Sequence, residues 1–294
     1  MKILITGGKG QLGTEIYKCF TEGKTALGIP KVLKEKNVVH QRDVDTLDIT
    51  DLNSVLELFN SEKYDAVINC AAYTNVNGCE SERDLAFKVN AIGPRNLAIA
   101  SERIGAKLVQ ISTDYVFSGD GNIPYVEWDL CNPQSAYGKS KLLGENYVRE
   151  LSSKYFIVRT AWLYGYYGNN FVKTMIKINS QNGGSKVVCD QRGNPTNCED
   201  LAHHILKLLT TEEYGIYHAT GNGECSWYDF ARKIVELAKI NAKVDPCTTE
   251  EYPTPAKRPA YSSLDNMMLR STVGDEFRPW EEALKEFINN YENK

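Results

Sequence analysis

The chain has 294 residues, of which 42% are hydrophobic and 24% are charged, the balance of an ordinary globular protein. A formal net charge of -4 provides no basic field for a nucleic-acid backbone, and no apolar run approaches the about 20 residues that span a bilayer. The eight cysteines form no CxxC pair, and the first residues lead straight into a glycine turn instead of a secretion signal. We therefore expect free thiols and a cytoplasmic protein that binds neither nucleic acid nor membrane.

Apolar strands and amphipathic helices alternate from the first residues to about residue 160. The predicted strands are 2–6, 38–41, 66–69, 107–112 and 156–159, and the predicted helices are 11–20, 51–59, 85–103 and 140–149. Strands that alternate with crossover helices form a parallel, doubly wound sheet, and continuously apolar strands fit because helices cover both faces. The sequence thus predicts an α/β fold of the Rossmann type.

Beyond residue 160 this rhythm weakens, and we interpret 161–197 and 222–294 as a smaller α/β substrate-binding lobe. A helix at 200–209 and a strand at 216–219 are expected to return to the first lobe. The dinucleotide-binding domain would then comprise 1–160 and about 198–221. The final helix, 280–291, carries one apolar stripe, which we expect to pack against the body of the protein.

A glycine turn separates the first strand from the first helix. Gly7, Gly10 and Gly13 satisfy the pattern G-x-x-G-x-x-G. Glycine admits backbone angles closed to other residues and lets a pyrophosphate approach main-chain N–H groups at a helix start. Such turns are common, so the pattern gains its weight from the strand and helix on either side. We predict dinucleotide binding rather than a plain turn.

An acidic residue after the second strand is expected to receive the adenosine ribose hydroxyls. Asp43 is the candidate, and its carboxylate would favour NADH by repelling a 2′-phosphate. The adjacent Arg42 could accept that phosphate and permit NADPH. Both cofactors stay open at this point, as does the alternative that the two residues form a solvated charge pair.

The candidate catalytic residues are Tyr137, Lys141 and Thr113. Tyr137 and Lys141 form a Y-x-x-x-K pattern, which places both on one face of a helix if that helix has already begun at Tyr137. A phenol has a pKa of about 10, and a nearby cation would bring it closer to the working range. The pattern is frequent by chance, but here it follows a hydroxyl-bearing strand end, Ser112-Thr113-Asp114-Tyr115. We predict acid–base chemistry beside a nicotinamide.

Hydroxyl, tyrosine and lysine in that order behind a glycine turn resemble the extended branch of the short-chain dehydrogenase/reductases. Within that branch the chain is most similar to the dTDP-4-dehydrorhamnose reductase family, over essentially its whole length. The matching stretches include Leu47-Asp-Ile-Thr50, Asn69-Cys-Ala-Ala-Tyr-Thr74, Ser112-Thr-Asp-Tyr-Val-Phe117, Arg159-Thr-Ala-Trp-Leu-Tyr-Gly165, Asn169-Asn-Phe171, Asp190-Gln-Arg-Gly-Asn-Pro-Thr196 and Lys257-Arg-Pro259.

The resemblance implies reduction of the 4-keto group of a dTDP-linked 4-keto-6-deoxyhexose by NADH or NADPH. It also implies roles for individual residues. The expected cofactor-binding residues are Gly7, Gly10, Gln11, Leu12, Gly13, Asp43, Asp48, Ile49, Ala71, Ala72, Tyr73, Thr74, Tyr137 and Lys141. The expected substrate-binding residues are Thr113, Asp114, Tyr115, Trp162, Asn170 and Arg258. Asn90 is a candidate support for the lysine, with a plain helix-surface asparagine as the alternative.

The chain departs from the family pattern at two places. Asn77-Gly78 stands where the family usually has Asp-Lys, and Arg192 replaces an uncharged residue, where it would either contact the diphosphate or reach solvent. A homodimer agrees with some relatives, and magnesium has been associated with the family, although no ligand cluster in the sequence requires it. Two rival functions stay open, a nucleotide-sugar epimerase or synthase and a non-catalytic subunit like the regulatory subunit of methionine adenosyltransferase.

Overall fold

The computed structural model describes residues 1–291. Within this range six strands form one parallel sheet in the order β10-β5-β4-β3-β1-β2. The strands are β1 (Lys2–Thr6), β2 (Val38–Arg42), β3 (Ala66–Asn69), β4 (Lys107–Thr113), β5 (Tyr155–Thr160) and β10 (Gly215–His218). The predicted doubly wound Rossmann-like sheet is thereby confirmed.

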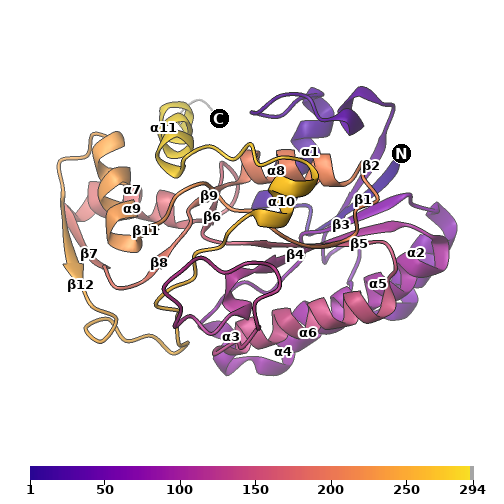
Figure 1. Ribbon diagram of the computed structural model, residues 1–294, viewed down its shortest axis with the longest axis horizontal. Helices are drawn as coiled ribbons and strands as arrows, with labels where there is room; N and C mark the ends of the chain where they lie inside the picture. The colour runs from indigo at the N-terminus through magenta and orange to yellow at the C-terminus, as the bar shows by residue number, and fades with distance from the viewer. Residues whose placement is uncertain (292–294) are drawn as a thin grey trace.

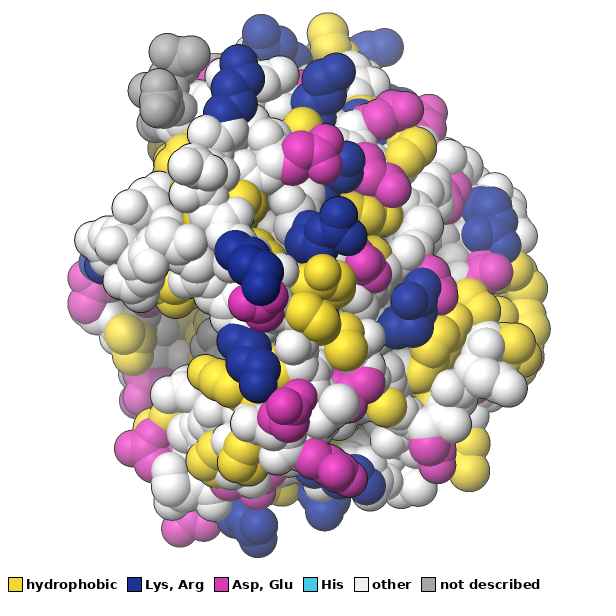
Figure 2. All heavy atoms as spheres, turned by 90° about the vertical axis from the view of Figure 1, so that its left-hand side faces the viewer, with side chains coloured by type: hydrophobic (Ala, Val, Ile, Leu, Met, Phe, Trp, Pro, Cys, Tyr) yellow, Lys and Arg dark blue, Asp and Glu magenta, His cyan; other side chains and the backbone are white. Residues whose placement is uncertain are grey.

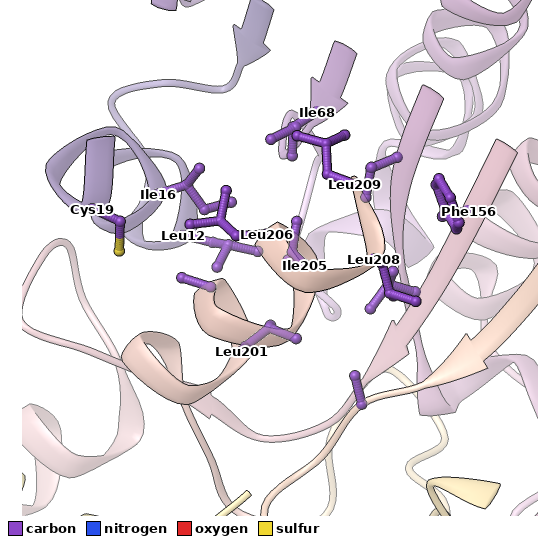
Figure 3. Close-up of a cluster of buried hydrophobic side chains, with 14 of the residues drawn as sticks. Leu12, Ile16, Cys19, Ile68, Phe156, Leu201, Ile205, Leu206, Leu208 and Leu209 are labelled. Carbon is purple, nitrogen blue, oxygen red and sulfur yellow. The ribbon is translucent and has the colours of Figure 1, made fainter. Parts of the chain in front are cut away.

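Helices cover both faces of this sheet (Figure 1). One face packs against α1 (Gln11–Glu22) and α8 (Cys198–Leu208), and the other against α2 (Leu52–Glu62), α5 (Gly93–Ile104) and α6 (Ala136–Leu151). Alternate strand residues serve the two cores: Ile3 and Ile5 face α1 and α8, whereas Leu4 faces the other helices. Figure 3 shows the first of these cores, where leucines of α8 meet Leu12 and Ile16 of α1.

Two predicted helices differ from the structure. The expected helix 85–103 consists of α4 (Arg83–Phe87), the π-helical turn η2 (Lys88–Ile92) and α5. The expected helix 140–149 begins at Ala136, because the Ser135 hydroxyl accepts a hydrogen bond from the Gly138 N–H (3.1 Å) and caps the N-terminus. The earlier start places Tyr137 in the first turn of α6.

The rest of the chain builds a second hydrophobic core beside the carboxyl ends of the strands. It lies between α7 (Phe171–Asn182), α9 (Trp227–Leu237) and α11 (Trp280–Asn290), and Phe230, Trp280 and Phe287 are buried there. The prediction that the final helix packs on the body is confirmed. The remaining elements are η1 (Lys31–Lys34), α3 (Gly78–Ser81), η3 (Asp114–Val116), β6 (Leu163–Tyr164), β7 (Gly184–Val188), β8 (Arg192–Gly193), β9 (Thr196–Asn197), β11 (Cys225–Ser226), β12 (Lys243–Cys247) and α10 (Met267–Thr272).

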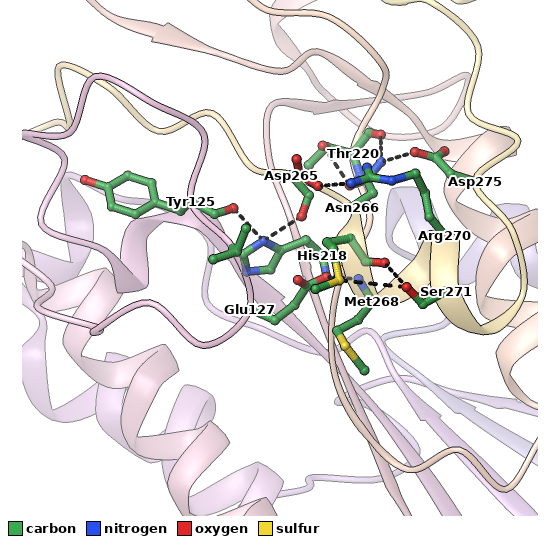
Figure 4. A network of polar contacts seen from close by, with 12 residues as sticks. Tyr125, Glu127, His218, Thr220, Asp265, Asn266, Met268, Arg270, Ser271 and Asp275 are labelled. Atoms are coloured by element: carbon green, nitrogen blue, oxygen red, sulfur yellow. Dashed lines mark hydrogen bonds and ion pairs between the residues drawn. The ribbon is translucent and has the colours of Figure 1, made fainter.

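Strand β10 anchors the second part of the chain to the sheet. It pairs with β5, and the Nδ1–H of its His218 donates to the carbonyl oxygens of Tyr125 (3.0 Å) and Asp265 (3.2 Å) (Figure 4). The buried Glu127 accepts hydrogen bonds from the N–H groups of His218 and Met268, both 3.0 Å. Segments that are far apart in the sequence are therefore held together behind the carboxyl edge of the sheet.

The outer surface carries charges of both signs. At the end of the molecule that bears α7, β7 and β12, acidic and basic side chains are interspersed (Figure 2). Among the described residues, no helix combines the length and the apolar character needed to cross a membrane.

Candidate functional site

The glycine turn brings the start of α1 against the ends of the strands. Gly7 has a φ of +63°, and a Cβ at this position would lie 2.5 Å from the main-chain nitrogen of Ala71. A Cβ on Gly13 would collide with the Gly7 carbonyl oxygen, so Gly13 permits close packing and does not line a cavity. Gly10 is the N-cap of α1 and provides no side-chain acceptor for the first N–H groups. This helix start can therefore receive a phosphate.

A cavity of about 500 Å³ opens over this turn, and we call it the glycine-turn cavity. Its volume lies within the usual range for a small-molecule site. The predicted cofactor residues that line it are Gly7, Gly10, Asp43, Asp48, Ile49, Ala71, Ala72 and Tyr73. Ile49 is 5% exposed: it lines the cavity and also belongs to the core under α2 and α5.

Asp43 and Arg42 point to different surroundings. The Asp43 carboxylate accepts hydrogen bonds from the N–H groups of Lys9 and Val44, both 2.9 Å, and thereby joins β2 to the glycine turn. The Arg42 guanidinium donates to the Gln41 carbonyl oxygen (3.1 Å) and does not line the glycine-turn cavity. The ammonium of Lys9, which does line the cavity, forms an ion pair with Asp45.

A second cavity of about 530 Å³ continues from the first, because Gly10, Cys70 and Ala72 line both. We call it the tyrosine cavity. The predicted site residues that line it are Gln11, Leu12, Thr74, Thr113, Asp114, Tyr115, Tyr137, Lys141, Trp162 and Arg258, together with Gly10 and Ala72. The two cavities form one trench along the carboxyl edge of the sheet, where ligands bind in open α/β folds.

The phenol of Tyr137 is held between α6 and the end of β4. Its ring meets that of Tyr115 edge-on, with centroids 5.5 Å apart. Burial and the Asp114 carboxylate both raise the pKa of Tyr137, while the Thr113 hydroxyl acts in the opposite direction. The expected lowering of this pKa by the lysine is therefore wrong. A phenol that remains protonated at neutral pH is suited to give up a proton to a developing alkoxide.

Lys141 lies one turn after Tyr137 and is 4% exposed. Its ammonium donates to the Ile111 carbonyl oxygen (2.6 Å) on β4, which explains why it does not act chiefly on the phenol. Burial lowers the pKa of Lys141 to about 8, and Glu145 opposes this shift. The Lys141 ammonium is thus held near the end of β4, beside the tyrosine cavity.

Asn90 supports this arrangement from the π-helical turn η2. Its side chain accepts from the Tyr73 N–H (2.8 Å) and donates to the Tyr73 carbonyl (3.0 Å) and the Ser140 hydroxyl (3.0 Å). The residue is 1% exposed, which excludes a helix-surface role. It connects the cofactor-side loop after β3 to the residue that precedes Lys141.

A buried ion pair fixes α6 to the two strands beside it. The Glu145 carboxylate accepts from the Ser112 hydroxyl on β4 (2.5 Å) and from the Arg159 guanidinium on β5 (2.7 and 3.0 Å). Ser112 and Arg159 are register partners in the sheet, and both ionic side chains are at most 2% exposed. We call these three residues the Glu145 clamp. It lies directly behind Thr113 and one helical turn from Lys141.

The hydroxyl and carboxyl groups at the end of β4 are bonded to each other. Thr113 donates to Asp114 Oδ1 (2.8 Å) and accepts from the Tyr115 N–H (3.2 Å). Asp114 is 3% exposed. Burial raises the pKa of Asp114 to about 6, although the hydroxyls of Ser262 and Thr113 counteract part of this rise.

Comparisons with known proteins agree with this geometry. The family model described as the RmlD substrate binding domain matches residues 1–293. The dTDP-4-dehydrorhamnose reductase of Aggregatibacter actinomycetemcomitans is 39% identical, over 97% of this chain and 97% of the relative. The chain belongs to the dTDP-4-dehydrorhamnose reductase family. The resemblance inferred from the motifs is therefore confirmed.

Two solved structures of the dTDP-4-dehydrorhamnose reductase family superimpose on nearly the whole chain. The protein from Clostridium acetobutylicum is 53% identical and has a TM-score of 0.93, covering 99% of this chain and 100% of its own. The protein from Bacillus anthracis, solved in complex with NADP, is 44% identical and has a TM-score of 0.92, covering 98% of this chain and 99% of its own.

In this family member, two stacked indoles form part of the wall of the tyrosine cavity. The rings of Trp162 and Trp227 lie 3.6 Å apart and 9° from parallel, and both line the cavity. Trp162 has a φ of +48°, a conformation that a non-glycine residue adopts only at a cost. Gly193 leaves space for it, because a Cβ there would lie 2.7 Å from the indole. Sequence reasoning missed Trp227, which follows the α9 N-cap.

Asn170 does not line either cavity, and its neighbour Asn169 does. The Asn170 amide donates to the Gln11 side chain (2.9 Å) and to the Gly165 carbonyl (2.8 Å), and its oxygen caps α7 by accepting from the Lys173 N–H (3.1 Å). Its position is therefore structural: it links the start of α7 to the glycine turn.

The departures from the family pattern have local explanations. Arg192 is 44% exposed, forms an ion pair with Glu224 (3.1 Å) and lines neither the glycine-turn cavity nor the tyrosine cavity. Gly78 lies against the Tyr73 hydroxyl and the Asn75 side chain, whose oxygen accepts from the Gly78 N–H (2.9 Å). Within residues 1–291, no group of three or more His, Cys, Asp or Glu side chains is arranged to hold a metal ion.

Proposed function

We propose that this chain reduces the 4-keto group of dTDP-4-dehydro-6-deoxy-L-mannose to give dTDP-L-rhamnose, with NADH or NADPH as the hydride donor. The observation that carries the proposal is the trench itself, in which the glycine turn and the set Thr113, Tyr137 and Lys141 line joined cavities. Family membership supplies the substrate class, and the NADP complex of the Bacillus anthracis relative supports the cofactor.

The residues present fit a dinucleotide. The uncapped start of α1 and the glycine cradle beside Ala71 suit a pyrophosphate, and Asp43 lies at the ribose end. We assign 1–160 and about 198–221 to cofactor binding, and 161–197 and 222–294 to substrate binding. A homodimer and a cytoplasmic location stay predictions.

The chemistry divides between the cofactor and the chain. When bound, the dihydronicotinamide supplies a hydride to C4 of the sugar. The Tyr137 phenol gives its proton to the C4 oxygen, and Thr113 hydrogen-bonds to the same oxygen. Lys141 binds the nicotinamide ribose with its ammonium. The raised pKa of Tyr137 serves this direction of reaction, because the proton is present before the hydride arrives.

The test is the rate of NADH or NADPH oxidation by the dTDP-linked 4-keto sugar. Tyr137→Phe should lower kcat by about 10²- to 10⁴-fold, because it removes the proton donor but keeps the ring. Lys141→Met should also lower turnover. Lys139→Met is its matched control, because Lys139 is exposed on the same helix and its replacement should leave turnover unchanged. A Tyr137→Phe variant with near-native turnover would exclude Tyr137 as the donor.

Net consumption of the reduced cofactor also distinguishes the rivals. An epimerase recycles its NAD and leaves no net oxidation, whereas a non-catalytic subunit gives no turnover with either cofactor. Stoichiometric oxidation of cofactor with formation of the 4-hydroxy sugar supports the reductase. Failure of both cofactors with a verified substrate would refute it.

A further inference from the structure

The Thr113 hydroxyl is already committed in the structure. A hydroxyl has one proton to donate and two lone pairs that accept. Thr113 gives its proton to Asp114 Oδ1 (2.8 Å) and accepts from the Tyr115 N–H (3.2 Å). The proposed function requires the same proton for the oxygen at C4 of the substrate. Both bonds cannot be made at once.

Turning Thr113 towards the substrate has a cost at Asp114. This carboxyl group is 3% exposed, and among residues 1–291 its second oxygen, Oδ2, has no hydrogen-bond partner. Loss of the Thr113 bond would leave a buried carboxylate without that donor. Burying a charge without compensation is among the most expensive changes a protein can make.

The groups around Asp114 come from several elements. Tyr115 follows it in η3, Tyr137 and Lys141 approach from α6, and Arg258 approaches from the segment before Ser262. These four residues line the tyrosine cavity together with Asp114, whereas Ser262 does not. Burial is the main cause of the raised pKa of both phenols, and the Asp114 carboxylate raises both further. The Lys141 ammonium is occupied by the Ile111 carbonyl. A neutral Asp114 would remove the unfavourable charge from beside Tyr137.

We propose that Asp114 is protonated in the reactive complex and donates its proton in a hydrogen bond to Thr113, which frees the Thr113 hydroxyl to donate to the C4 oxygen of the substrate. The inference rests on the proposed function. No proton leaves Asp114 in the cycle: C4 gains the hydride of the cofactor, the C4 oxygen gains the Tyr137 proton, and Tyr137 recovers a proton from solvent. Asp114 is thus a positioning residue that sets the direction of one hydroxyl.

This inference predicts a pH dependence. Burial raises the pKa of Asp114 to about 6, so the neutral form is accessible near neutrality and is lost as the pH rises. Turnover should therefore fall as pH increases above about 6, by as much as tenfold per pH unit where this group alone limits the rate.

Asp114→Asn tests the proposal directly. Its carboxamide can donate to Thr113 as a protonated Asp114 would, but it does not titrate near neutral pH. We expect kcat within about threefold of the wild type at pH 6, and a variant profile that lacks the decline above this pH. Asp114→Ala, which offers no donor, should lose at least tenfold at every pH. Asp84→Asn, the same change at an exposed carboxylate on α4, should keep the wild-type profile.

A second measurement does not depend on turnover. Difference infrared spectroscopy of the complex with oxidised cofactor and product should show a protonated-carboxyl band at pH 6 that weakens as the pH rises and that Asp114→Asn removes. An Asn variant inactive at every pH would show that the carboxylate itself is required and overturn the proposal. An unchanged decline above pH 6 would also overturn it. If instead the wild type oxidises neither NADH nor NADPH with the verified dTDP-linked 4-keto sugar, the proposed function fails, whatever Asp114 does.

Discussion

The two ends of the trench are built by different means. At the glycine-turn end the polar contacts are exposed to solvent: Asp43 accepts from main-chain N–H groups, and the exposed Lys9 pairs with the exposed Asp45. At the tyrosine end a buried network holds the parts, with the Glu145 clamp joining α6, β4 and β5. The difference suggests that the end proposed to bind adenosine tolerates adjustment, whereas the end proposed to carry out hydride and proton transfer is fixed by buried charge.

The largest expected effect comes from breaking the clamp. Arg159→Met removes the partner of Glu145 and leaves a carboxylate that is 1% exposed without its counter-ion. The free energy of unfolding should fall by about 3–5 kcal/mol. Denaturant unfolding measures this loss, and a loss below about 1 kcal/mol would show that the clamp is not the rigid part of the site.

The next effect concerns the charge of Lys141. Its ammonium is present below its pKa of about 8 and is lost as pH rises through that value. Cofactor affinity, followed by nicotinamide fluorescence, should therefore weaken by about tenfold per pH unit above pH 8. Lys141→Arg stays charged and should lack this decline, whereas Lys139→Arg should retain it. An affinity of the wild type that is constant from pH 7 to 9 would contradict the assignment to the ribose.

A smaller effect is expected at the start of α6. Ser135→Ala removes the cap that accepts from the Gly138 N–H and should cost about 1 kcal/mol of stability. Because Tyr137 lies in the same turn, kcat should fall as well, while Ser135→Thr keeps both. A stability loss without any change in kcat would show that the cap does not position the phenol.

The smallest effect is expected at the open end. Lys9 and Asp45 are exposed, so Asp45→Asn should leave the midpoint of thermal unfolding unchanged at both low and high salt. A clear, salt-sensitive shift would show that this end is held as firmly as the clamp, and the contrast between the two ends would disappear.

The sequence was informative where the signal was local and periodic. Apolar runs located the sheet strands, and the glycine turn and the Tyr137-to-Lys141 spacing located the trench. The start of α6 was placed too late, because Gly138 disfavours a helix and Ser135 was not recognised as the N-cap that compensates for it. The clamp was missed because Glu145, Ser112 and Arg159 meet only when the helix packs across two strands. The direction of the Tyr137 pKa depends on burial, which spacing does not report.

The place of β10 in the chain has a consequence for biogenesis. This edge strand covers β5, but it is translated more than fifty residues later, after α7 and α8. While a ribosome is making the intervening segment, the hydrogen-bonding groups of β5 on that side have no strand to pair with. Such an open edge is a template for association with other chains. A nascent polypeptide whose β10 has not yet emerged from the ribosome should therefore depend on chaperones more than one whose β10 can pair with β5.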